Sequence, residues 1–110
     1  MIDWDRLRDL KAEIGEADFM EVATMFLDES DEVIARLTGT QTAVTLEQDL
    51  HFLKGAALNL GFAQLAELCQ DGERQAAAGS TDIDFDSVRG TYAASRKIFV
   101  AECGSGGGCG

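Results

Sequence analysis

The sequence predicts an all-α fold, an antiparallel four-helix bundle with a short additional N-terminal helix. Its 110 residues include no proline, and its glycines gather at a few junctions and at the C-terminus. That distribution favours helices over strands and turns. Apolar residues also recur at steps of three and four, which is the period of one helix face. A chain of this length is expected to form one domain with one core.

Two helices are expected in the first third of the chain. One runs from Asp3 to Ile14, with Asp3 as its N-cap and Gly15 as its stop. The next runs from Asp18 to Leu37, because Asp18 and Glu21 have the spacing of a capping box. We expect its buried stripe to consist of Phe19, Val22, Ala23, Phe26, Val33, Ile34 and Leu37.

The next two helices are expected to form a hairpin. The third is capped either by Thr42 or by Thr45 and stops at Gly61, and the fourth covers Phe62 to Ala78. Because the link between them is very short, the two helices must run antiparallel.

A fifth helix is expected from a cap at Asp84 or Asp82 to about Ala101. Residues 1–102 would then form the bundle, and residues 103–110 a flexible, glycine-rich tail. The short chain lacks an extra helical hairpin that could serve for dimerisation, so we expect a monomer.

Composition narrows the classes of function. A formal net charge of −11 disfavours binding to nucleic acid and to anionic membranes, because like charges repel. No apolar run approaches the ~20 residues of a membrane span, and the N-terminus lacks a signal-peptide pattern, so we expect a cytoplasmic protein. With one histidine and no Cys-x-x-Cys pair, we expect no metal site and no cofactor, and Cys69 reads as a core residue.

The only histidine, His51, lies on the third helix beside its apolar stripe. Lys54, Gly55 and Leu58 follow it at i+3, i+4 and i+7, so these residues share one face with it. A glycine inside a helix costs about 0.5–1 kcal/mol relative to alanine. Here Gly55 also clears space through which another molecule can reach the imidazole.

The hairpin also predicts what faces the histidine. His51 lies about ten residues before the reversal at Gly61, so the residues level with it lie about ten after, around Gln70 to Arg74. Glu73 is the carboxylate in that window that can face the imidazole, whereas Asp71 points to another side.

The pattern His-x-x-Lys-Gly, followed by small residues and Leu60-Gly61, resembles the histidine-containing phosphotransfer (HPt) domains of two-component phosphorelays. Phe26-Leu27 and the segment from Phe62 to Cys69 resemble the second and fourth helices of that family. The resemblance covers roughly Ile2 to Ala101 on a leucine-periodic helical background.

The resemblance implies that His51 accepts a phosphoryl group on Nε2. An unperturbed imidazole has a pKa of about 6.5, so it is partly neutral near pH 7. Glu73, where relatives carry glutamate or glutamine, would accept the Nδ1–H bond and leave Nε2 free. Lys54 would stabilise the charge of the phosphoryl oxygens.

The implied partners are a response regulator receiver domain and a sensor histidine kinase, and any magnesium would belong to the receiver's pocket. Gly55 would let that pocket approach, and Leu58 would supply apolar docking surface. Met20 and Leu27 either fill the edge of the core or stay exposed as partner surface. Phe52 either covers one side of the imidazole or widens the docking patch.

Two other functions stay open. A helical adaptor would need no phosphorylation, and exchanging His51 would leave its partner binding intact. A phosphoacceptor domain of a chemotaxis-type histidine kinase would take its phosphoryl group directly from kinase and ATP, and a glutamate at position 73 mildly favours it. The chain has no glycine-rich phosphate loop, so it is not itself expected to be a kinase, nor a turnover enzyme of any other kind.

Overall fold

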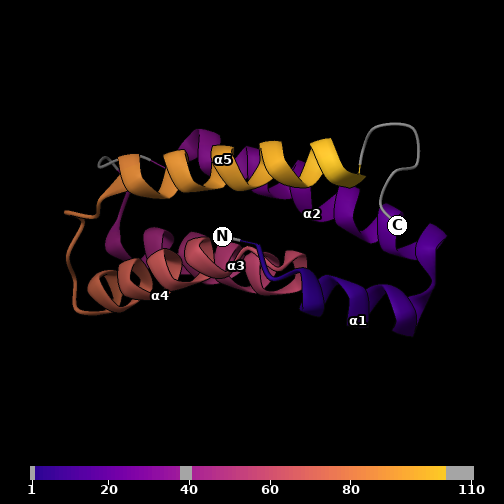
Figure 1. Ribbon diagram of the computed structural model, residues 1–110. Coiled ribbons are helices and arrows are strands. Elements are labelled where there is room, and N and C mark those ends of the chain that lie inside the picture. Colours follow the sequence, from indigo (N-terminus) through magenta and orange to yellow (C-terminus); the bar gives the residue numbers. More distant parts are fainter. Residues whose placement is uncertain (1, 38–40, 104–110) are drawn as a thin grey trace.

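The computed structural model describes residues 2–37 and 41–103 and is all-helical there, as predicted. Figure 1 shows an elongated bundle in which α2 and α5 lie on one side and the α3–α4 hairpin on the other. The N-terminal helix α1 continues beyond the turn of that hairpin. The helix bounds are α1 Trp4–Ile14, α2 Glu16–Arg36, α3 Ala43–Leu60, α4 Ala63–Ala77 and α5 Phe85–Cys103.

The predicted start of the second helix is wrong by two residues. Gly15, with φ of 86°, ends α1 and directly precedes α2, so α2 begins at Glu16. Asp18 and Glu21 therefore lie inside the helix and form no capping box. A glycine reaches this positive φ without strain, which lets one residue join the two helices.

The other predicted caps resolve to one candidate each. Asp3 accepts a hydrogen bond from the Arg6 N–H at 3.1 Å and caps α1 as expected. Thr42, and not Thr45, caps α3, and Asp84 caps α5 by accepting from the Ser87 N–H at 3.1 Å.

The buried stripe of α2 differs from the predicted one. Val22, Phe26 and Ile34 are only half-buried. Leu27 is 7% exposed and Ser30 is fully buried. At this level α2 is joined to α5, because the Tyr92 hydroxyl donates to the Leu27 carbonyl at 3.2 Å. The buried residues of this stripe are Phe19, Ala23, Leu27, Ser30, Val33 and Leu37.

The N-terminal segment is fastened to the turn of the α3–α4 hairpin. Gly61 ends α3 in the left-handed conformation, with φ of 74°. The Asp3 N–H donates to the Gly61 carbonyl at 2.5 Å, and Ile2 forms an isolated antiparallel bridge with Phe62. A Cβ at position 61 would lie 2.7 Å from the Asp3 carbonyl oxygen, so this turn requires glycine.

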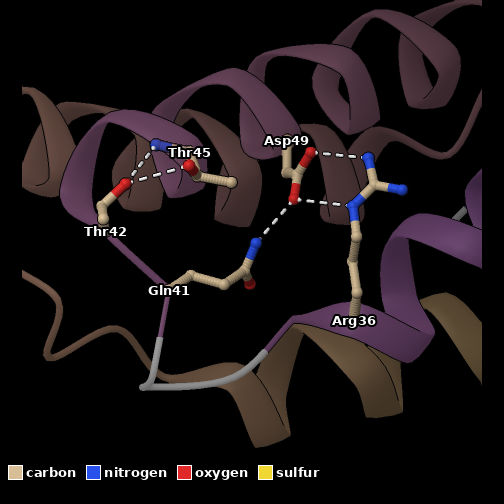
Figure 2. Close-up of polar contacts among 5 residues, drawn as sticks. All are labelled: Arg36, Gln41, Thr42, Thr45 and Asp49. Carbon is tan, nitrogen blue, oxygen red and sulfur yellow. Dashed lines mark hydrogen bonds and ion pairs between the residues drawn. The ribbon is translucent and has the colours of Figure 1, made fainter.

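A buried carboxylate anchors the first half of α3 to the end of α2 (Figure 2). Both Asp49 oxygens accept from the Arg36 guanidinium, Oδ2 from Nε at 3.1 Å and Oδ1 from Nη2 at 2.8 Å. Gln41 donates to Oδ2 at 2.9 Å. The guanidinium holds the pKa of Asp49 below its usual range against the opposing effect of burial. This network fixes α3 two residues before His51.

The structure bears on the predicted C-terminal tail and on the search for a membrane-spanning helix. The segment predicted to be a flexible tail, residues 103–110, lies outside the described residues except for Cys103, which ends α5, so the domain boundary stays a prediction. Among the described residues, no helix is both long and apolar enough to cross a membrane.

We predict that Asp49→Asn lowers the free energy of unfolding at pH 7 by about 1–3 kcal/mol, because it removes a charged acceptor from buried hydrogen bonds. Since the folded-state pKa of Asp49 is lowered, its ionisation stabilises the fold above the unfolded pKa of about 4 and ceases to do so as pH falls through the folded value. Urea unfolding should therefore show a smaller difference in free energy of unfolding between wild type and variant at pH 3 than at pH 7.

The matched control is Asp71→Asn, which breaks an exposed ion pair with Arg74 and should cost less than about 0.5 kcal/mol. If Asp49→Asn lowered the free energy of unfolding equally at both pH values, the assigned role of Asp49 would be contradicted.

Candidate functional site

His51 projects from the middle of α3 into solvent. Its side chain is 69% exposed, whereas its neighbours Leu50 and Leu53 on the same helix are fully buried. Those leucines fix the rotation of α3 about its axis, and the imidazole is left on the outer side. The ring is therefore accessible to a second protein.

Glu73 reaches His51 from the neighbouring helix α4. Its Oε2 lies 3.0 Å from His51 Nδ1, so the carboxylate predicted from the hairpin register does contact the imidazole. An ionised carboxylate can only accept hydrogen bonds. The nitrogen that contacts it must then carry the proton, and in the neutral ring Nε2 keeps its lone pair toward solvent.

Lys54 is turned onto the same carboxylate. Its Nζ lies 2.9 Å from Glu73 Oε1, an oxygen that is screened from solvent. Both side chains are largely covered, at 25% and 22% exposed. One carboxylate thus holds the imidazole with one oxygen and the ammonium with the other.

Electrostatics keep Glu73 ionised. The hydrogen bond from the Lys54 ammonium lowers the pKa of Glu73 below its usual range, and the contact with His51 acts in the same direction against burial. Cys69 on the same helix behaves oppositely, because burial raises the pKa of its thiol to about 12. The thiol stays protonated and packs in the core, as predicted, so it is no competing nucleophile.

The distance between the two helices depends on Gly72, which the sequence analysis missed. A Cβ there would lie 3.0 Å from Leu50 Cδ1, so glycine lets α4 approach α3 next to Glu73 and His51. The only sequence signal for it is a glycine inside a helical pattern, which by itself does not show what lies opposite.

Gly55, in contrast to Gly72, does not lie against another helix. A Cβ at position 55 would meet nothing within 4 Å, so packing within the chain gives no reason for glycine there. Its carbonyl accepts from Asn59 Nδ2 at 2.9 Å, a support for the helix that the sequence analysis also missed. The space that Gly55 leaves open therefore faces outward, on the same face as His51.

Comparison with protein families decides the identity of this arrangement. Residues 21–97 match the family model of the Hpt domain. The chain belongs to the Hpt family. Membership gives it a phosphotransfer role in two-component signalling, where Hpt domains interact with receiver and kinase proteins and carry phosphoryl groups instead of turning over a substrate. Comparisons with curated proteins and with solved structures give no significant match.

The surface around His51 in this Hpt domain is only partly the one expected. Leu58, at 55% exposed, lies on the histidine face of α3 as predicted. Phe52 and Met20 are half-buried and pack against the core. Leu27 is only 7% exposed, so of its two expected roles it fills the core and does not form a partner surface.

The described part of the Hpt domain holds no group of three or more metal-ligating side chains. Of the expected site residues, His51 and Lys54 each contact Glu73 in the structure. Gly55 and Leu58 lie on the same face as His51, and Met20 lies on α2.

We predict that the two glycines respond oppositely to substitution. Gly55→Ala should raise the free energy of unfolding by about 0.5–1 kcal/mol, because alanine favours the helix and its methyl group meets nothing. Gly72→Val should lower it by about 1–3 kcal/mol, because the added carbons press on Leu50. Thermal and urea unfolding of both variants would test this, and equal signs would contradict the assignment.

Proposed function

We propose that this Hpt domain accepts a phosphoryl group on His51 Nε2 from the phosphoaspartate of a receiver domain, or directly from a histidine kinase, and passes it to another receiver aspartate. The observation that carries the proposal is the exposed imidazole whose Nδ1 lies 3.0 Å from an ionised carboxylate. This contact orients the ring and directs the free lone pair outward, which is what an in-line attack on phosphorus requires.

The transfer step uses the groups of the site as follows. The Nε2 lone pair of His51 attacks phosphorus, an N–P bond forms, and the P–O bond to the receiver's aspartate breaks and returns the electron pair to that carboxylate. The imidazole gains positive charge, which Glu73 offsets through Nδ1–H. Any magnesium belongs to the receiver's pocket.

Lys54 has two positions in this proposal. In the unphosphorylated domain its ammonium lies on Glu73 Oε1. Lysine has a flexible stem and a point charge, so the ammonium can turn toward the phosphoryl oxygens once they arrive and stabilise their negative charge. Gly55 leaves room for the receiver, and Leu58 supplies an apolar contact beside the histidine.

The proposal also covers the setting of the reaction. It places the domain in the cytoplasm with its receiver and kinase partners, and it has the domain act as a monomeric carrier, not as an enzyme. The charge of Glu73 offsets the imidazolium whichever donor supplies the phosphoryl group, so it is compatible with both the receiver route and the direct kinase route.

The test is a transfer assay with the wild-type domain and His51→Gln. We expect label from a phosphorylated receiver to move to wild type, to survive alkali, to be lost in acid and to be absent from the variant. Label that arrives only from kinase and ATP would support the direct kinase route. Failure of every donor to label a folded domain would leave a helical adaptor.

We predict that Glu73→Ala slows phosphorylation of His51 roughly ten- to hundredfold, because a hydrogen bond to a charged group is worth about 1.5–3 kcal/mol. Glu73→Gln should slow phosphorylation less than Glu73→Ala does, since its amide oxygen still accepts from Nδ1–H. Single-turnover transfer rates measure both, and circular dichroism checks that both variants are folded. If Glu73→Ala transferred as fast as wild type, Glu73 would have no orienting role.

A further inference from the structure

A second surface lies away from His51, along the outer side of α5. It is a groove of about 680 Å³ between α5 and the end of α2. Its apolar floor includes Ile34, Ala93 and Val100, and no residue of α3 or α4 lines it. Figure 1 shows α5 and the α3–α4 hairpin on opposite sides of the bundle, so a molecule in this groove leaves the histidine uncovered.

The charge of the groove opposes the charge of the chain. Arg89, Arg96 and Lys97 line it, and no acidic residue does. These are three of only nine basic residues in a chain with twenty acidic ones. Among the described residues, Asp31 pairs with Arg96 on the basic rim that Arg89, Arg96 and Lys97 form, and three bases to this one acid leave the local charge positive.

The two arginines of the rim are held in place. Arg96 donates to both oxygens of Asp31, each at 3.0 Å, and Arg89 donates to the Leu37 carbonyl. A guanidinium has five N–H donors, so each retains donors for another molecule. Positive groups that are already positioned lose little side-chain entropy when they bind an anion.

The shape of the surface selects its occupant. From Arg89 to Val100 the lining residues follow one face of α5 at helical steps, over roughly 17 Å at 1.5 Å per residue. A stripe of this length suits a packed helix, whose apolar face enters the groove while its flanks meet the basic rim. Nucleic acids and anionic membranes are polyanionic, and a net charge of −11 repels them over longer distances.

We propose that this groove docks an amphipathic helix of a partner protein whose apolar stripe is flanked by Asp and Glu. The helix packs along α5 as an additional helix of the bundle, with carboxylates on Arg89, Arg96 and Lys97. Because His51 stays uncovered, docking and phosphoryl transfer can take place together, and the tethered partner gains a high effective concentration near the domain.

The probes are two designed amphipathic peptides of about 18 residues, long enough to form a helix. They share the same leucine stripe and carry either glutamates or lysines at the flanking positions. The readouts are amide chemical shifts of the isotope-labelled domain and fluorescence anisotropy of labelled peptide. We expect the glutamate peptide to shift residues of α5 and the end of α2, and the lysine peptide to bind this groove at least about tenfold more weakly.

Lys97→Glu should lower the affinity of the domain for the glutamate peptide about tenfold. The matched control, Arg8→Glu on α1, makes the same charge change at a side chain that is 76% exposed and should leave the affinity unchanged. The proposal is overturned if the lysine peptide shifts the α5 residues as strongly, if the glutamate peptide maps to the His51 face, or if Lys97→Glu has no effect. It is also overturned if these residues shift with protein concentration alone, since a second copy would then occupy the groove.

Discussion

The close approach of α3 and α4 is the constraint on which the rest of the site depends. The contact between His51 and Glu73 joins residues 22 positions apart, and it forms only if two helices run antiparallel at short distance. Gly61 reverses the chain, and Gly72 lets Leu50 sit against the backbone of α4. The fold therefore uses two glycines for opposite purposes, one for its positive φ and one for its missing side chain.

The carboxylate of Glu73 pairs with both His51 and Lys54, and it leaves Nε2 of His51 open to solvent. Glu73 contacts the imidazole through one oxygen and the ammonium through the other, so both groups share one anionic partner. In the proposed transfer the phosphoryl group brings negative charge to His51, and Lys54, one helical turn away, supplies a positive charge. In the proposed transfer the ammonium exchanges one anionic partner for another over a short distance, so no new charge has to be brought in.

The proposed docking groove on α5 would account for the uneven distribution of charge over the chain. Acidic residues outnumber basic ones by more than two to one, yet the groove on α5 is lined by bases alone among its charged residues. Tyr92 and Arg96 bind Asp31 beside it and tie α5 to α2. The same contacts that stabilise the bundle thus hold the rim of the groove in place.

The amino-acid sequence was enough to predict the all-α class, the approximate helices, the hairpin and the His51–Glu73 pairing, because helical period and a short link fix which residues lie level. It could not determine the start of α2, the rotation of its stripe that buries Leu27, the choice of Lys54 for Glu73, or the packing of Gly72 on Leu50. These depend on contacts between helices distant in sequence. A periodic pattern defines a face of one helix, but only tertiary packing decides what that face meets.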